Sequence, residues 1–323
     1  MQRIGWLIAL GLIMALVLGG CTIGDESGAF PTALPIAPTL ALAPAEMPTA
    51  LPLEGVGAPG RPSTGGDVVA LVNGAPISRA EYEARLAQAL TYRAAQGTLT
   101  KESQVVAPSL AEQVLEWLID RTLIAQAAQA LGVTVSPGEI EAALANVRGT
   151  DTARFAQWLS ANGLSEDSFR EQLGDDLLVA AVRDRVTAQL PPEAEQVRAL
   201  HILVGDEALA ARLVAELRGG ADFASLARQF SEDEGTRSRG GELGFIPRGV
   251  MSPAFDAIAF SLSAGEISDP VRSDLGYQII QVLEHAARRP VSADLWPAVQ
   301  QYAFEQWLAE QRTQARIERL LTP

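Results

Sequence analysis

Residues 239–255 read RGGELGFIPRGVMSPAF, and this stretch decides how the second half of the chain is built. Its four glycines make it a poor helix and a poor strand. It nevertheless carries large apolar side chains, among them those of Leu243, Phe245, Met251 and Phe255. Core segments rarely need so much backbone freedom, so the glycines around Leu243 weigh against a purely packing role for these side chains. The alternative is ordinary core packing, which has most weight for Phe255 at the start of an amphipathic helix.

Segments with regular patterns lie on both sides of this stretch. RALHILV (198–204) and GYQIIQVLEH (276–285) read as strands, and DEALAARLVAELRGG, ADFASLARQFS and PAFDAIAFSL read as helices. Strands separated by helices and turns indicate an α+β unit over residues 197–287.

The preceding residues, 67–195, predict a mostly helical domain. Leu110, Val114 and Trp117 recur at helical spacing, and Ser136 with Glu139 has the spacing of a capping box. We also expect one helix over residues 291–323, with Ile317 and Leu320 on its apolar face. A single helix has no core of its own, so it should pack on the 67–195 domain.

The N-terminus has the features of an export signal and a tether. An apolar run follows Arg3 and ends in Leu-Gly-Gly-Cys21, which predicts a signal peptide over residues 1–20. The last four residues resemble the bacterial lipoprotein box, which implies cleavage before Cys21 and a lipid on its thiol. The alternative is a plain anchor helix with an incidental cysteine. Residues 21–66 are rich in proline and alanine and predict a linker.

Composition excludes several classes of function. The net charge of −14 argues against nucleic acid as a partner. One cysteine and two histidines leave no intramolecular disulfide and no cysteine- or histidine-rich metal site. No cofactor motif is present, so we expect neither a cofactor nor a metal.

Several linked motifs identify residues 197–287 as similar to the parvulin-type peptidyl-prolyl cis/trans isomerases. They are HILV (201–204), DFASLARQFSED (222–233), GGELGFIPRGVM (240–251), GEISDPV (265–271) and GYQII (276–280), in this order. The lipobox, helical domain, single parvulin module and C-terminal helix together resemble extracytoplasmic foldases of the PrsA/SurA type.

The resemblance implies a set of site residues. Leu243, Met251 and Phe255 match the pocket for the proline ring. His201 matches the first active-site histidine, and Asp233 matches a position held by cysteine or aspartate, although it could also be a helix cap.

Further positions of the motifs bear on activity and specificity. Ser273 matches a hydroxyl that orients the histidine network. Gln278 replaces the second histidine that the family commonly has in GYHII, which leaves the level of activity open. Asp206 and Glu207 follow the first strand where some members bind phosphate, so we expect no phosphate requirement.

Three functions are compatible with these residues. The first is a lipid-anchored isomerase and chaperone at the extracytoplasmic face of the cell membrane, acting on unfolded exported polypeptides that contain X–Pro bonds. The second is a peptide clamp with little turnover, and the third is a spacer in an envelope complex. The sequence does not specify the clients, the oligomeric state or which membrane of the envelope is involved.

Overall fold

The computed structural model describes residues 67–95 and 107–321. The expected signal peptide, Cys21 and almost all of the residues before the first strand lie outside them. The described residues form two compact units. One contains the residues up to Gln189 together with those from Glu305, and the other is Leu190–Phe304. The first unit is therefore discontinuous in sequence.

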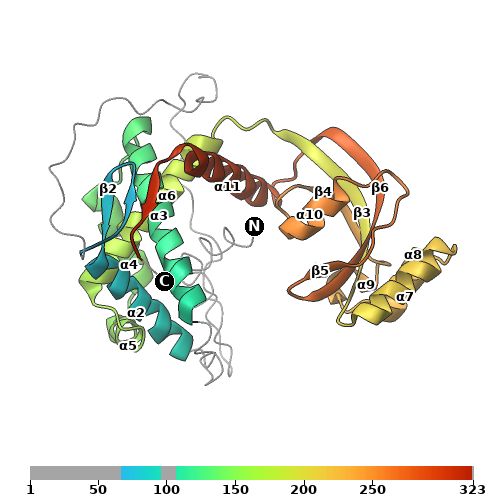
Figure 1. Ribbon diagram of the computed structural model, residues 1–323, viewed down its shortest axis with the longest axis horizontal. Coiled ribbons are helices and arrows are strands. Elements are labelled where there is room, and N and C mark those ends of the chain that lie inside the picture. The colour runs from blue at the N-terminus through green and yellow to red at the C-terminus, as the bar shows by residue number, and fades with distance from the viewer. Residues whose placement is uncertain (1–66, 96–106, 322–323) are drawn as a thin grey trace. The chain divides into compact units, whose positions relative to one another are not determined.

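The first unit is mostly helical (Figure 1). Its helices are α2 (Arg79–Ala95), α3 (Ala107–Leu131), α4 (Pro137–Arg148), α5 (Thr152–Ala161) and α6 (Glu166–Thr187). The capping box at the start of α4 forms as predicted: Ser136 Oγ accepts from the Glu139 N–H, and the Glu139 carboxylate accepts from the Ser136 N–H. Five buried apolar residues of α4, α5 and α6 make one core: Leu144, Phe155, Leu159, Phe169 and Leu173.

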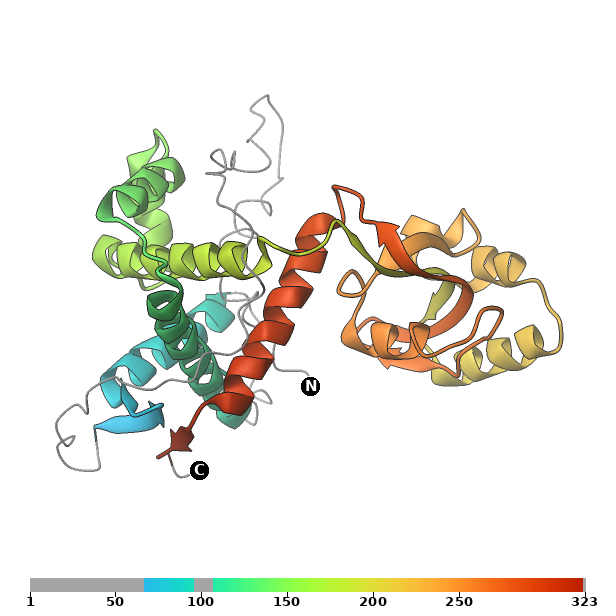
Figure 2. The same ribbon diagram turned by 90° about the horizontal axis from the view of Figure 1, so that it is seen from above.

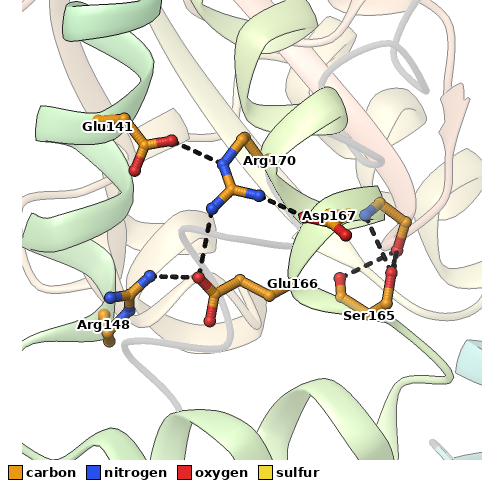
Figure 3. Close-up of polar contacts among 7 residues, drawn as sticks. Glu141, Arg148, Ser165, Glu166, Asp167 and Arg170 are labelled. Atoms are coloured by element: carbon orange, nitrogen blue, oxygen red, sulfur yellow. Dashed lines mark hydrogen bonds and ion pairs between the residues drawn. The ribbon is translucent and has the colours of Figure 1, made fainter.

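Charged side chains also join α4 to α6 (Figure 3). The Arg170 guanidinium donates to Glu141 Oε1 at 2.6 Å and also contacts Asp167 and Glu166. Arg148, at the end of α4, donates to Glu166 as well. Asp167 is 90% exposed, so this network lies on the surface.

The C-terminal segment belongs partly to the first unit. Helix α11 (Trp296–Gln314) is followed by strand β7 (Ile317–Arg319), which pairs with β1 (Val68–Val72) in a sheet of order β2-β1-β7, where β2 is Ala75–Ser78. Figure 1 shows the red C-terminal strand beside the blue strands. The prediction of one helix that includes Ile317 and Leu320 is therefore wrong, because β1 offers an open edge for pairing.

The second unit is built on an antiparallel sheet of order β4-β3-β6-β5. Its strands are β3 (Glu193–Val204), β4 (Glu242–Pro247), β5 (Val271–Ser273) and β6 (Gly276–Pro290), and its helices are α7 (Glu207–Arg218), α8 (Phe223–Phe230), α9 (Glu234–Arg237) and α10 (Pro253–Ala259). The α+β class is confirmed, but the mixed sheet that the parvulin resemblance implied is corrected, because the pairings β3–β4, β3–β6 and β5–β6 are all antiparallel. β3 and β6 pair along their whole length and form the centre of the sheet.

Alternation along β3 gives this sheet two buried faces. Ile202 and Val204 face α7 and α8, whereas Val197 and Ala199 face Phe255 of α10. Figures 1 and 2 show helices on both sides of the yellow-to-orange sheet. The sequence reads residues 239–255 as a poor strand because of their glycines, but six of these residues form β4, which pairs with β3 from Glu242 to Pro247.

Within the described residues, no helix combines the length and the apolar character needed to cross a lipid bilayer.

Candidate functional site

Four polar side chains meet on the α10 side of the second unit's sheet. His201 Nε2 lies 2.8 Å from Asp233 Oδ2 and 2.9 Å from Thr236 Oγ1, and the Thr236 hydroxyl also contacts Asp233 Oδ2. On the other side of the ring, Nδ1 lies 3.4 Å from Gln278 Oε1. The imidazole is thus held at both nitrogens.

The glycine pair at 240–241 places this cluster. Gly241 has φ +82°, and its carbonyl accepts the His201 N–H at 2.9 Å. A Cβ at Gly241 would come within 2.2 Å of the His201 carbonyl oxygen. Only glycine tolerates both the positive φ and this close approach. The glycines that weaken helix and strand signals in the sequence therefore allow the backbone to approach the histidine strand.

Asp233 has two structural roles. Its Oδ1 accepts the Gly235 N–H as the cap of α9, and its Oδ2 belongs to the polar cluster. Burial raises the pKa of the carboxyl, but hydrogen bonds from Thr236 and His201 outweigh burial and leave the pKa below its usual value. Asp233 is therefore ionised at neutral pH. Because a carboxylate can only accept a hydrogen bond, we assign a proton to His201 Nε2, which donates to Asp233.

Gln278 lies on β6, next to β3. Its amide has a donor end and an acceptor end, whereas a neutral imidazole nitrogen has one function only. The oxygen accepts from Nδ1–H when His201 is protonated, and the rotated amide donates to Nδ1 when it is neutral. Gln278 can therefore hold the ring in either protonation state.

An apolar wall adjoins the polar cluster. Phe255 is completely buried, and its ring centroid lies 6.5 Å from that of His201, edge to face. Leu243 and Met251 are partly buried and pack on the core that contains Phe255. Phe255 thus supports the wall from behind, while Leu243 and Met251 keep exposed surface.

Exposure separates the roles of the polar groups. The His201 side chain is 6% exposed and that of Asp233 is 28% exposed. Thr236 and Gln278 are buried. Asp233 is therefore the most accessible of the four, and Thr236 and Gln278 contact the His201 ring from buried positions.

Ser273 does not join the network. Its hydroxyl donates to the Gly276 carbonyl at 3.0 Å and closes the turn between β5 and β6, and no hydrogen bond connects it to His201 in the described part of the chain. The expectation that Ser273 orients the histidine is corrected accordingly. Thr236, which the sequence reasoning missed, contacts the histidine instead.

The loop after β3 is acidic and internally bonded. Asp206 caps α7 through the Leu209 N–H, and Glu207 accepts from the Tyr277 hydroxyl at 2.7 Å.

No group of three or more histidine, cysteine, aspartate or glutamate side chains within residues 67–95 and 107–321 is arranged to hold a metal ion.

A separate hollow lies in the first unit. It is lined by Arg85, Gln88, Val114, Trp117, Arg121, Gln172 and Asp176. The guanidinium groups of Arg85 and Arg121 lie 5.5 and 4.8 Å from the Trp117 ring centroid. Because none of the residues implied by the parvulin motifs is there, we assign the isomerase site to the second unit.

The fold and the site define a peptidyl-prolyl isomerase domain of the parvulin class. Residues 191–284 match the family profile of the PPIC-type PPIase domain, and residues 48–183 match that of the SurA-like N-terminal domain. The chain belongs to the family of PrsA foldases, and it is a peptidyl-prolyl cis/trans isomerase.

Two relatives in sequence carry this assignment, and one solved structure is reported beside them as a similarity. The Foldase protein PrsA of Caldanaerobacter subterraneus is 35% identical over 67% of this chain and 73% of its own length. That of Geobacillus kaustophilus is 33% identical over 60% of this chain and 70% of its own. The crystal structure of a peptidylprolyl isomerase, PrsA, from Bacillus anthracis has a TM-score of 0.40 and 28% identity over 62% of this chain and 88% of that one.

Proposed function

We propose that the chain is a membrane-tethered isomerase and chaperone that acts on exported polypeptides, and that Asp233 and Met251 are the groups its clients touch. The observation that supports this most is that His201, which holds the ionised Asp233 carboxylate, lies beside Phe255 of the apolar core on which Leu243 and Met251 pack. Foldase and chaperone relatives support an unfolded polypeptide as the substrate.

The chemistry requires binding rather than bond breaking. Amide resonance opposes rotation of an X–Pro bond with a barrier of about 18–20 kcal/mol, and uncatalysed exchange takes tens to hundreds of seconds. Exchange in milliseconds requires about 5.5–7 kcal/mol of preferential binding to the twisted state. Rotation loses the charge separation of the planar amide, and it localises a lone pair on the proline nitrogen.

The two parts of the site fit these needs. Leu243 and Met251 would grip the pyrrolidine ring, while the Asp233 carboxylate near the peptide carbonyl would disfavour the charge-separated planar amide. His201, Thr236 and Gln278 would keep that carboxylate in place. The acidic loop at Asp206 supports a client that carries no phosphate.

Tethering is part of the proposal and rests on the sequence before residue 67. Lipid on Cys21 would hold the catalytic unit outside the membrane through the proline-rich linker, where unfolded exported chains emerge. A Cys21→Ser variant of the full chain should leave the membrane fraction while its isomerase activity in solution stays unchanged. Retention of that variant in the membrane would contradict anchoring through the thiol.

The site is tested by exchange measurements on a proline peptide, with magnetisation transfer between its cis and trans signals. We expect the full chain to accelerate exchange, and Asp233→Asn and Met251→Ala each to reduce kcat/KM about tenfold or more. A wild-type rate with both variants would reject this assignment.

A peptide clamp with little turnover is the second candidate, and Gln278 in place of the second imidazole favours it. Binding of the same peptide without acceleration of exchange would support the clamp.

A further inference from the structure

Asp256, in the first turn of α10, is a buried carboxyl that the proposed mechanism does not use. The residue is 6% exposed, and its Oδ2 accepts the N–H of Gly249 at 2.7 Å. Its Oδ1 is buried and has no hydrogen-bond partner among the residues that the structure describes. Burying a carboxyl with only one of its two oxygens hydrogen-bonded costs free energy of folding. The presence of Asp256 at this position therefore needs an explanation.

The bond from Gly249 anchors the turn that carries Met251. On one side of that turn, Arg248 stacks over the Phe260 ring at 3.9 Å. On the other, the Phe255 N–H donates to Ser252 Oγ. Residues 248–252 are thus held at both ends by α10 and its C-cap residue, Phe260. Of the contacts made by residues that precede Met251, the bond from Gly249 to Asp256 is the nearest to it in sequence.

Gly249 leaves little room for adjustment. Its φ is +90°, and a Cβ there would lie 2.4 Å from Tyr302 Cβ and 3.0 Å from the Ala298 carbonyl oxygen. The turn is therefore confined between this stretch of α11 and α10. The direction of the Gly249 N–H, and with it the path of the next two residues, depends on its acceptor.

We propose that Asp256 is a positioning residue for isomerisation: its carboxylate holds the 248–252 turn and thereby places Met251 in the wall of the proline pocket. This inference rests on the proposed function, because it assigns Met251 to that pocket. Asp256 itself touches no substrate.

The charge state of Asp256 changes close to neutral pH. Burial raises its pKa to about 6, against the lowering effects of the Gly249 N–H and of Arg248. Arg248 in turn pairs with Glu195 on β3, and residues 296–304 of α11 include no charged side chain. An ionised carboxylate accepts a stronger hydrogen bond than a neutral carboxyl does. The turn should therefore be held more firmly above pH 6 than below it.

The test compares Asp256→Ala, Asp256→Asn and, as a matched control, Asp269→Asn, which removes an exposed carboxylate of the same unit. In the full chain at pH 7.5, Asp256→Ala should raise KM about fivefold with kcat within twofold. Asp256→Asn keeps an acceptor oxygen and should restore most of the wild-type KM. Asp269→Asn should equal the wild type.

The second readout is the methyl signal of Met251 in full chain labelled with methyl-¹³C methionine, assigned with Met251→Leu. We expect this signal to shift with a midpoint near pH 6 in the wild type and to stay constant in Asp256→Asn. A constant wild-type signal, or unchanged KM in Asp256→Ala, would overturn the positioning role. If Met251→Ala leaves kcat/KM unchanged, the pocket assignment itself fails, which separates the two ideas.

Discussion

The two nitrogens of His201 face different kinds of partner, and this difference sets what each neighbour contributes. Nε2 faces two oxygens, those of Asp233 and Thr236, whereas Nδ1 faces the amide of Gln278. A hydroxyl between a histidine and a carboxylate can donate to one and accept from the other. Thr236 therefore fixes the position of the His201 ring relative to the Asp233 carboxylate.

This arrangement predicts a specific effect of removing the Thr236 hydroxyl. Thr236→Val has nearly the same shape but leaves Asp233 with one partner fewer, so kcat/KM should fall about tenfold, equivalent to about 1.4 kcal/mol. Thr236→Ser keeps the hydroxyl and should stay within about twofold of the wild type. Peptide exchange rates measure both, and equal activity of the valine and serine variants would contradict the role of the hydroxyl.

Residue by residue, the motifs led to His201, Asp233, Gln278 and the apolar wall, because each lies inside a recognisable stretch. The resemblance implied that His201 and Asp233 share one site, but their direct contact needed the fold, since β3 and α9 are separated by two helices. The role of Thr236 could not be predicted from the sequence, because a threonine three residues after an aspartate is common at the start of an ordinary helix. Ser273 was assigned from a motif position, and the turn geometry at Gly276 gave its hydroxyl a nearer acceptor.

Helix α10 contains a buried carboxyl, that of Asp256, whose burial costs less free energy when it is protonated than when it is ionised. The pKa of Asp256 is about 6 in the fold against 3.8 in an ordinary environment. Between these values the folded state binds more protons than the unfolded state does. The free energy of unfolding therefore falls as pH rises through this window, by about 3 kcal/mol in total.

An uncharged replacement should remove this pH dependence. Asp256→Asn is expected to raise the free energy of unfolding of the second unit by about 1–3 kcal/mol at pH 8 and to leave it nearly unchanged or lower at pH 4. Urea unfolding at both pH values measures the difference. A variant that is less stable than the wild type at pH 8 would show that the carboxylate is better compensated than its unpaired oxygen indicates.

Two ionic networks in the first unit differ in burial and should differ in importance. Arg312 of α11 donates to Glu116 at 2.8 Å and contacts Asp120, and both acids are on α3 and buried. Burial raises the pKa of Asp120, whereas for Glu116 the bonds from Arg319 and Arg312 outweigh burial and lower the pKa. The buried network fixes the C-terminal segment to α3.

Replacement of its central cation should be severe. Arg312→Met leaves two buried carboxylates short of a partner and should cost the first unit about 3–5 kcal/mol in urea unfolding. Arg170→Met removes the centre of the exposed network on α4 and α6 and should have a much smaller effect, because solvent screens those pairs. Equal losses in the two variants would contradict burial as the deciding factor.

The elements that the sequence predicted best are long helices with clear caps, such as α4. The strands β4 and β7 were missed for different reasons. β4 lies in a glycine-rich segment whose strand character comes from its partner β3, not from its own residues. β7 has only three residues, and Ile317 falls at helical spacing from α11, so local pattern could not reveal that β1 has a free edge.

The path of the chain through the two units determines which segments can be removed without unfolding the rest. The helical unit is made from residues on both sides of the isomerase unit, since Glu305 and later residues return to it. β7 pairs with β1, and Arg319 donates to Glu116 of α3. Truncation before β7 should thus harm the helical unit, although the deleted residues follow the isomerase unit in sequence.

The same connectivity predicts that the isomerase unit can be excised. We expect a chain in which about 15 Gly/Ser residues replace 190–304 to keep the helical unit folded, because such a linker spans about 20 Å on average and the β1–β7 and Glu116–Arg312 contacts remain available. It should retain the helical circular dichroism of that unit and lose all acceleration of proline exchange. Suppression of aggregation of an unfolded client should persist if the helices hold clients. The matched chain that also lacks residues 305–321 should unfold at lower urea concentration, and equal stability of the two chains would show that the returning segment is dispensable.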